Sequence, residues 1–287
     1  GAIALIEASV AMLDMRQHSG EHPRLGVVDV CPFIPLRDVS MEACADMART
    51  VVARLAERGD IPLFLYGAAA SCDERTVLSR LRKGEYEGLE ARLKGTDTVH
   101  DDDTRLPDAG AMAWTETVAR SGGITVGARP ILVAYNVNVD EKDARVARKI
   151  CSIVRTSGRM LKSEQGGKIR SHGMLKGVQG MGVQVEELGI SQVSMNLLNV
   201  KDCPLHLAFK TCESLANDHE TSLCGSEIVG LVPLQAMISA GEFFDPEAED
   251  ERAKVAAAVK GLGLNQHHRF VPDEHIIEWA LDREVIQ

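Results

Sequence analysis

Apolar residues recur at helical spacing at the start of the chain. Ile3, Ile6, Val10 and Leu13 would lie on one face of a helix that ends near Met15. Helices normally begin after a Ser, Thr, Asp or Asn that serves as N-cap, and none precedes this pattern. We therefore expect a first helix without a capped start.

The rest of the first half alternates short apolar runs with amphipathic stretches. Ser40 precedes a long amphipathic pattern and is expected to cap a helix that ends at Gly59. Residues 94–123 are rich in small and acidic residues and predict a long loop, which inside a compact region is usually functional or disordered. The other predicted elements are strand 26–35, strand 61–66 and helical residues 75–93 with an interruption at Gly84.

The second half has a more regular pattern. Its elements follow the order βαββαβ, which is typical of the ferredoxin-like arrangement with helices on one face of an antiparallel sheet. Glycine-rich residues 127–130 separate the halves, so we expect two domains, 1–129 and 130–287. The predicted elements are strands 131–139, 175–185, 192–200 and 223–232, helices 141–157 and 204–219, and terminal helices 234–241, 250–261 and 272–281.

Composition places the chain among soluble globular proteins, with 287 residues of which 45% are apolar and 26% charged. A net charge of −10 and an aromatic content of 4% argue against a nucleic-acid partner. The apolar start contains Glu7 and lacks a basic lead-in, and no other stretch approaches membrane-spanning length. The seven cysteines lie far apart without a CxxC pair, so we expect reduced thiols in a cytosolic protein without membrane segments.

The most informative loop contains His22 between Glu21 and Pro23. A residue before proline is restricted to extended backbone, so the ring of His22 is held in a defined direction. A loop histidine beside a carboxylate can act as a general acid and base near neutral pH. The alternative is a surface histidine in an ordinary turn.

Two other chemistries are conceivable for this loop. His18 and His22 are spaced as in zinc-binding helices, but Gly20 and Pro23 break any helix here and no third ligand is evident, so we expect no metal. Cys31 could form a Cys/His pair with His22, although its apolar neighbours favour a buried structural thiol.

Two further features allow a functional and a structural interpretation. Residues 145–176 carry many Arg and Lys with Glu164 as almost the only acid, which indicates either an attractive field for an anionic ligand or a solvated helix and loop. Two glycine-containing turns, at residues 122–127 and 179–182, could bring backbone amides to a ligand, or mark kinks and bulges in strands. Neither has the spacing of a nucleotide fingerprint, which disfavours a dehydrogenase-like nucleotide-binding protein.

The segment GEHPRLGVVDVCPF at residues 20–33 resembles the GEHPRxGxxDVxPF motif of the formiminotransferase family. The resemblance continues in family order over nearly the whole chain. Its further blocks are Leu65–Gly67, Arg82–Glu87, Gly127–Arg129, Ala134–Asn138, Val178–Gly182, Gln192–Ser194, Asn196–Leu198, Gly225–Ser226 and Val229–Pro233.

This resemblance implies an α+β fold of two ferredoxin-like subdomains, with antiparallel or mixed sheets and the first subdomain incomplete. It also implies a cytoplasmic, homodimeric transferase that moves a formimino group from N-formimino-L-glutamate to the co-substrate tetrahydrofolate, in histidine degradation and one-carbon metabolism. The residues do not discriminate a formimino from a formyl donor. A polyglutamylated folate is a further expected ligand of the basic residues 145–176.

The family's catalytic histidine corresponds to His22. From their proximity, Glu21 or Asp29 is expected to orient its ring, and Arg24 to hold a substrate carboxylate by a two-pronged contact. The family's folate-binding loop falls within residues 110–123. Its candidate residues are Trp114, Thr117, Ser121, Gly122 and Gly123.

The start of the chain departs from the family pattern. The family opens with a strand, a helix and two more strands before the helix that begins here, which by average element lengths is roughly fifty to sixty residues. The uncapped first helix agrees with an N-terminal truncation. We also expect that the cyclodeaminase activity fused to some family members does not reside in this chain. The second interpretation is a truncated, non-catalytic relative that binds folate or forms oligomers.

Overall fold

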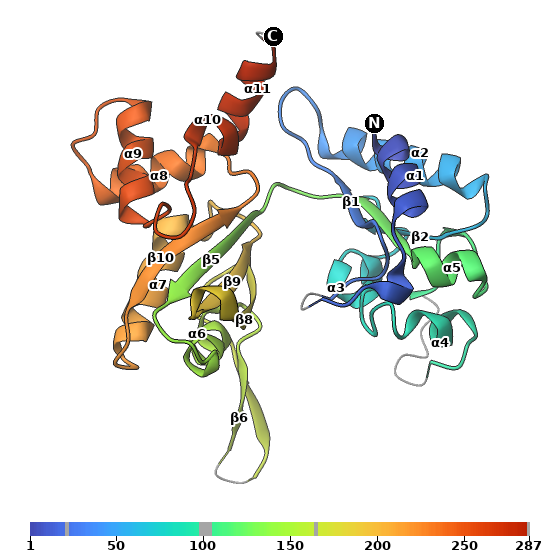
Figure 1. Cartoon of the computed structure of the whole chain (residues 1–287), viewed down its shortest axis with the longest axis horizontal. Coiled ribbons are helices and arrows are strands. Elements are labelled where there is room, and N and C mark those ends of the chain that lie inside the picture. The colour runs from blue at the N-terminus through green and yellow to red at the C-terminus, as the bar shows by residue number, and fades with distance from the viewer. Residues whose placement is uncertain (21–22, 98–104, 164–165, 286–287) are drawn as a thin grey trace. The chain divides into compact units, whose positions relative to one another are not determined.

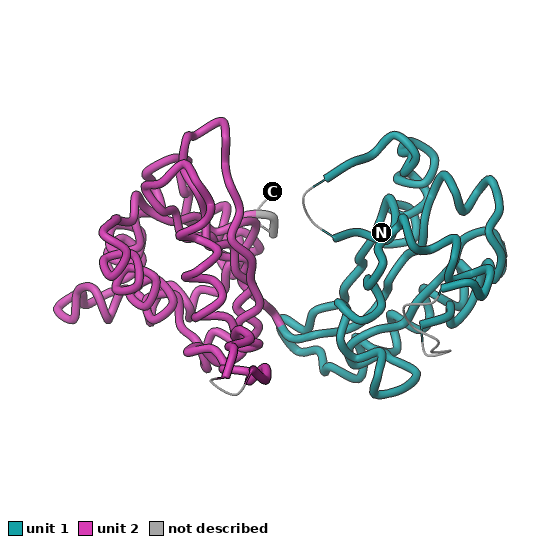
Figure 2. The backbone as a smooth tube through the Cα atoms, turned by 90° about the horizontal axis from the view of Figure 1, so that it is seen from below, with its two compact units in different colours: residues 1–130 teal, residues 131–287 magenta. Residues whose placement is uncertain are grey.

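The computed structural model describes residues 1–20, 23–97, 105–163 and 166–285. The chain divides into two compact units, residues 1–130 and 131–287 (Figure 2). Each unit contains a four-stranded sheet and its own hydrophobic core. The α+β fold class is therefore as the sequence predicts.

The sheet of unit 1 has the strand order β1-β4-β2-β3 (Figure 1). The central strand β4 runs parallel to both β1 and β2, whereas β3 runs antiparallel to β2. Adjacent parallel strands require crossover connections, which here contain helices. The bounds are β1 Asp29–Phe33, β2 Pro62–Gly67, β3 Ala109–Gly110 and β4 Ile124–Ala128.

Helix α2 (Met41–Ala56) packs on one face of this sheet. Ala45, Ala48 and Val52 are buried against Leu63 and Ile124. The Ser40 hydroxyl accepts a hydrogen bond from the Ala43 amide at 3.1 Å, which confirms the predicted N-cap. The uncapped first helix is also confirmed as α1 (Ala2–Met12), which packs beside α2 in the same core.

The opposite face of the sheet carries a second, smaller cluster. Phe64 and Tyr66 alternate with Leu63 and Leu65 along β2, so they point away from α2. They pack against short helices, of which the first two lie in the interrupted helical stretch 75–93 and the third in the predicted loop 94–123. These helices are α3 Leu78–Leu81, α4 Leu89–Leu93 and α5 Glu116–Ser121, with 3-10 turns at Met15–Gln17 and Asp73–Arg75.

Two predictions for unit 1 were wrong in part. Residues 94–123 are not all loop, because Thr115 caps α5 by accepting from the Val118 amide at 3.2 Å. The glycine-containing residues 122–127 are not a turn throughout, because Ile124–Ala128 form the fully buried central strand. Gly127 lies there because a Cβ would approach the Tyr66 carbonyl oxygen to 2.4 Å. Gly127 therefore allows β4 to pack closely against β2.

Unit 2 has the predicted βαββαβ order. Its strands form an entirely antiparallel sheet with the order β10-β5-β9-β8, as in ferredoxin-like folds (Figure 1). One face is covered by α6 and α7 through the apolar side chains of the core. The bounds are β5 Val133–Val139, α6 Arg145–Val154, β8 Val178–Val185, β9 Ile190–Leu197, α7 Leu205–Asn217 and β10 Leu223–Val229, with a 3-10 turn at Glu186–Leu188.

Strand β8 continues without a bulge through Gly180 and Gly182, so the expected kink is absent there. A Cβ at Gly182 would lie 2.3 Å from the backbone nitrogen of Arg148 on α6. A Cβ at Gly180 would lie 3.1 Å from the Cys151 sulfur on the same helix. These glycines let α6 approach the sheet closely.

Unit 2 also contains a hairpin that the sequence did not predict. Strands β6 (Arg159–Lys162) and β7 (Lys168–Ser171) pair antiparallel and are largely exposed. The three predicted terminal helices are present, the last in two parts: α8 Leu234–Phe244, α9 Glu251–Gly261, α10 Pro272–His275 and α11 Ile277–Val285. Among the described residues, no helix combines the length and apolar character needed to cross a membrane.

Candidate functional site

His22 and Glu21 lie outside the described residues, so their predicted roles stay predictions. The residues on either side of them are described. Residues 18–20 and Arg24 line a cavity of about 490 Å³ together with Gly84, Glu85 and Glu87. This volume is in the range of small-molecule sites. The described residues on both sides of His22 therefore line a polar cavity of unit 1.

Arg24 is held by two acidic side chains. Its Nη2 donates to Glu87 Oε1 at 2.6 Å, and its Nη1 donates to Glu87 Oε2 at 2.8 Å and to Glu85 Oε2 at 3.2 Å. The two-pronged contact with Glu87 raises the pKa of Arg24 and lowers the pKa of Glu87. The carboxylate partners of Arg24 are thus glutamates of the same unit.

The same guanidinium also contacts His18. Its Nη2 donates to the His18 carbonyl oxygen and its Nε donates to His18 Nδ1, both at 3.3 Å. The Tyr86 amide in turn donates to the Arg24 carbonyl oxygen at 2.9 Å. Residues 18, 24 and 85–87 are joined by these contacts.

Asp29 closes a turn at the start of β1. Its Oδ1 accepts from the Leu25 amide at 2.9 Å and from Arg82 Nε at 3.1 Å, and its Oδ2 accepts from Arg82 Nη2. The Asp29 backbone has φ of 55°, in the left-handed region that few non-glycine residues adopt. Its carboxylate is occupied by Arg82, a residue to which the sequence gave no role. The sequence signal for these contacts was the Arg82–Glu87 block of the family resemblance. It contains Arg82, the partner of Asp29, and both glutamate partners of Arg24.

The folate-loop candidates fall into two groups. The Trp114 ring lies 6.0 Å from the Tyr86 ring, and Thr117 is an exposed residue of α5. Ser121 is buried, and its carbonyl oxygen accepts from the Val27 amide at 2.8 Å. Trp114 thus lies beside Tyr86, and Ser121 lies beside the segment that follows residue 24.

Gly122 and Gly123 contact the backbone that follows Arg24. The Gly123 amide donates to the Leu25 carbonyl oxygen at 3.0 Å. Gly122 has φ of 66°, and a Cβ there would lie 2.3 Å from the same oxygen. Both glycines are explained by this close approach, while a role in folate binding stays a prediction.

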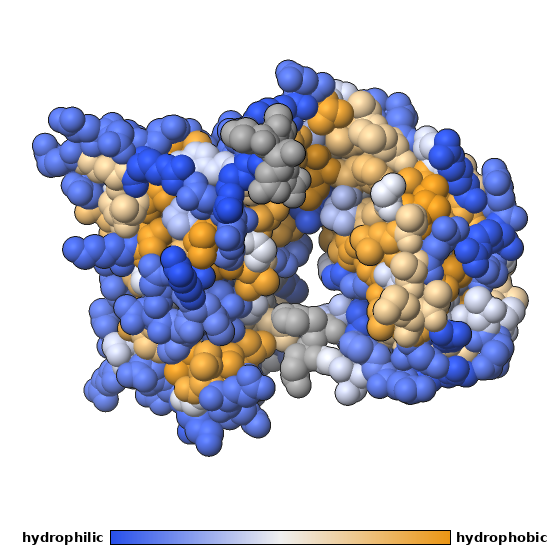
Figure 3. Space-filling view, turned by 45° about the horizontal axis from the view of Figure 1, so that its top comes forward, coloured by the Kyte–Doolittle hydropathy of each residue, from blue (hydrophilic) through white to orange (hydrophobic). Residues whose placement is uncertain are grey.

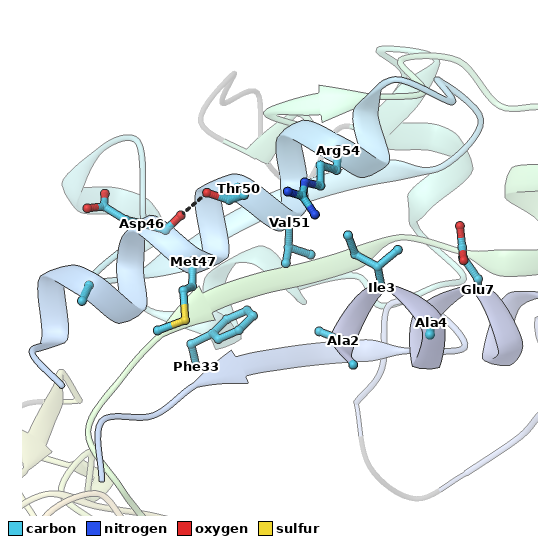
Figure 4. Close-up of a pocket in the computed structure, with 12 residues that line it drawn as sticks. Ala2, Ile3, Ala4, Glu7, Phe33, Asp46, Met47, Thr50, Val51 and Arg54 are labelled. Carbon is cyan, nitrogen blue, oxygen red and sulfur yellow. Dashed lines mark hydrogen bonds between the residues drawn. The ribbon is translucent and has the colours of Figure 1, made fainter. Parts of the chain in front are cut away.

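A second, mostly apolar cavity of about 820 Å³ lies between α1, α2 and the end of β1 (Figure 4). Figure 4 shows Met47 beside Phe33, with Ile3 facing Val51. Apolar residues are exposed on both units, as Figure 3 shows. None of the predicted site residues that the structure describes lines this cavity. Its polar and charged lining residues are Glu7, Asp46, Thr50 and Arg54.

In unit 2 the sequence missed a polar network on the sheet face opposite the core. Gln192 Nε2 donates to Asn138 Oδ1 at 2.9 Å and to Glu227 Oε2 at 3.2 Å, and Asn136 Nδ2 donates to the same Glu227 oxygen at 3.4 Å. The alternation of Asn with buried apolar residues along β5 was the available signal.

The basic residues 145–176 lie on α6 and on the β6–β7 hairpin, apart from Arg155 and Lys176, which lie in connecting segments. Their hairpin members Arg159, Lys162, Lys168 and Arg170 are exposed to solvent. The described part of the chain contains no group of three His, Cys, Asp or Glu side chains placed to hold a metal ion. Cys31 is half-buried, and desolvation raises the pKa of its thiol, which fits a structural role.

Fold and site together define a two-unit α+β protein whose first unit presents a polar cavity at a histidine-bearing loop. Residues 1–129 match the family model described as the N-terminal subdomain of the formiminotransferase domain, and residues 134–282 match that of the formiminotransferase domain. The chain belongs to the formiminotransferase family.

Known relatives match over both units. The chain is 36% identical to a glutamate formimidoyltransferase of Streptococcus pyogenes serotype M1, over 85% of this chain and 73% of the relative. It is 36% identical to a formimidoyltransferase-cyclodeaminase of Dictyostelium discoideum, over 99% of this chain and 50% of the relative. It is 37% identical to a formimidoyltransferase-cyclodeaminase of Rattus norvegicus, over 98% of this chain and 49% of the relative. The chain spans about half the length of these bifunctional relatives.

Proposed function

We propose that the chain is a glutamate formimidoyltransferase that moves the formimino group of N-formimino-L-glutamate to tetrahydrofolate, a step of histidine degradation and one-carbon metabolism. The observation that carries this proposal is the GEHPR motif of this family, whose first and last residues, Gly20 and Arg24, line a polar cavity. The names of relatives that are 34–36% identical over 85% of the chain support it.

The reaction needs one group that accepts and then returns a proton. N5 of tetrahydrofolate attacks the formimino carbon and forms a C–N bond, while the C–N bond to glutamate breaks. The proton of N5 passes to His22 and from there to the leaving amine of glutamate. An imidazole suits both transfers because its ordinary pKa of about 6.5 lies near the working pH.

Both substrates carry carboxylates, whereas the net charge of the chain is −10. The basic residues 145–176 supply a local field of opposite sign, and we assign them to the glutamate tail of folate. Polyglutamylated folate should then bind more tightly than the monoglutamate, and added salt should reduce the difference. We place the active protein in the cytoplasm as a homodimer, as the family resemblance implies.

Replacement of His22 by Ala tests the proposal, with His268→Ala, an exposed histidine of unit 2 outside the basic segment 145–176, as the matched control. Loss of a general acid and base should lower kcat by about 10²–10⁴-fold. Near-normal turnover of His22→Ala would refute the role of this residue. Parallel assays with N-formylglutamate identify the donor.

The second interpretation is a truncated, non-catalytic relative that binds folate or forms oligomers. The chain covers about half the length of its formimidoyltransferase-cyclodeaminase relatives. Titration of the wild-type chain with tetrahydrofolate distinguishes the two. Binding without formimino transfer would identify a non-catalytic folate-binding relative, and turnover would exclude it.

A further inference from the structure

The sheet of unit 2 carries amide side chains on the face that points away from its core. Alternate residues of a strand point to opposite faces, so the neighbours of the buried core residues Val137 and Val193 point away from the core. Those neighbours include Asn136, Asn138 and Gln192. The strand register places Asn138 directly opposite Gln192, so their side chains meet on this face.

Glu227 of β10 points to the same face. Its neighbour Ser226 is buried and accepts a hydrogen bond from the core residue Tyr135 at 2.9 Å, so Glu227 faces the other way. The register pairs Glu227 with Asn136. Its Oε2 accepts from Gln192 Nε2 at 3.2 Å and from Asn136 Nδ2 at 3.4 Å.

The network holds the Glu227 carboxylate in one arrangement. An amide nitrogen has two N–H groups, and those of Gln192 go to Asn138 Oδ1 at 2.9 Å and to Glu227 Oε2. Asn138 is 1% exposed and Gln192 is 7% exposed. Buried polar groups keep the hydrogen bonds they have, because an unpaired one is costly away from water. The carboxylate therefore has a fixed direction.

One oxygen of this carboxylate is left open. An ionised carboxylate has about four acceptor positions, two on each oxygen, and the two amides use only Oε2. Among the described residues, none donates a hydrogen bond to Glu227 Oε1, and no Lys, Arg or His pairs with Glu227. The side chain is half-buried, so water solvates its charge only in part. A carboxylate held by neutral amides in this way favours a cationic N–H donor.

We propose that this face of unit 2 binds the formimino group of formiminoglutamate, and that Glu227 contacts it directly. The formimino group is an amidine, a strong base that carries a positive charge near neutral pH. Its N–H groups stand on two nitrogens on either side of one carbon, as in a guanidinium, and can donate to Glu227 Oε1. The identity of this cation rests on the proposed function.

The test is binding of formiminoglutamate to the full chain without tetrahydrofolate, measured by titration calorimetry. N-formylglutamate is the matched compound, because a neutral formyl oxygen replaces the cationic nitrogen. Glu227→Gln keeps the size of the side chain and removes its charge. The control variant is Glu213→Gln on α7, where the carboxylate accepts from Lys210 at 2.7 Å.

Wild type should bind formiminoglutamate more tightly than N-formylglutamate. Glu227→Gln should weaken binding of formiminoglutamate by about 10–100-fold and of N-formylglutamate by less than about twofold, because a hydrogen bond to a charged partner is the contact that is lost. Glu213→Gln should change neither affinity. Unchanged binding of formiminoglutamate in Glu227→Gln would overturn the assignment, and so would absence of binding to wild type.

A readout in the wild-type chain covers the case that Glu227→Gln fails to fold. The side-chain amide resonances of Gln192 and Asn136 should shift when formiminoglutamate is added, and stay in place with N-formylglutamate at the same concentration. The pteridine ring of tetrahydrofolate also has N–H groups on either side of one carbon. Shifts with tetrahydrofolate but not with formiminoglutamate would identify the pteridine as the occupant and overturn the assignment.

Failure of this site and failure of the proposed function give different results. Binding that depends on the charge of Glu227, in a chain without formimino transfer, would contradict only the function. Turnover by wild type, together with unchanged binding of formiminoglutamate in Glu227→Gln, would contradict only the role of Glu227.

Discussion

Asp29 and Gly182 occupy positions that few other residues would tolerate. Asp29 combines a φ of 55° with a carboxylate that receives the Leu25 amide and Arg82. The sequence marked Asp29 because it lies near His22, but could not identify its partner, since Arg82 is 53 positions away. Gly182 was predicted to mark a kink, because a sequence does not show which helix packs above a strand.

Replacement of Gly182 by Ala should lower the free energy of unfolding by about 1–3 kcal/mol, because the new methyl group would overlap the backbone of α6. Gly167→Ala is the matched control, since among the described residues a Cβ there would meet the Ser163 hydroxyl, at 3.2 Å, and no backbone atom. Urea unfolding measures both. Equal stability of Gly182→Ala and wild type would show that α6 is free to move away.

The Arg24–Glu87 ion pair should make a small part of the stability dependent on pH. Its hydrogen bond lowers the pKa of Glu87, so the stabilisation is present above the ordinary pKa of 4.5 and is lost as the pH falls through the lower, folded-state pKa. The carboxylate is largely exposed, which limits the effect to at most about 1 kcal/mol. Wild type should exceed Glu87→Gln in thermal stability at pH 7, and the difference should vanish in acid. A difference that grows in acid would contradict this assignment.

Elements with long periodic patterns were predicted well, and short or atypical ones were not. The strands and helices of unit 2 repeat apolar positions over several turns or alternations, as in β5 and α7. Helix α5 has six residues, too few for a period to emerge. Strand β4 is buried on both faces and contains Gly127, so it lacks the alternation of a half-exposed strand. The strands of the β6–β7 hairpin have four residues each and are largely exposed, so their pattern is too short to distinguish them from a loop.

Ser40→Ala removes the N-cap of α2 and should lower the free energy of unfolding by about 1 kcal/mol, because the Ala43 amide loses its acceptor. Ser40→Asp should be nearly neutral, since a carboxylate caps as well as a hydroxyl. Ser9→Ala is the matched control within α1, where the hydroxyl donates to the Leu5 carbonyl oxygen. Denaturant titration compares the three variants. A loss of stability in Ser9→Ala equal to that in Ser40→Ala would argue against a capping effect.

At the scale of the whole molecule, each unit has its own core, and unit 2 has a complete βαββαβ sheet. The candidate site was found in part from sequence because Glu21, His22 and Arg24 are neighbours in one motif. Its other members, Glu85 and Glu87, come from a distant segment, and the Asn138–Gln192–Glu227 network needs three strands to be paired. Such long-range pairing is not visible in a local pattern.

Unit 2 should fold as an isolated protein of residues 131–287, because its hydrophobic cluster is closed within these residues. We expect one cooperative unfolding transition and dispersed amide resonances. Gly182→Ala should shift the transition of the isolated unit as it does in the whole chain. A non-cooperative transition would show that the second unit depends on the first.

The proposed reaction passes a formimino group from formiminoglutamate to tetrahydrofolate on this chain. The most direct measurement is the release of free glutamate from formiminoglutamate with and without tetrahydrofolate. We predict release only with tetrahydrofolate, at one glutamate for each folate converted, because the folate N5 is the attacking atom. Release without folate would indicate hydrolysis, and no release under either condition would contradict the claim.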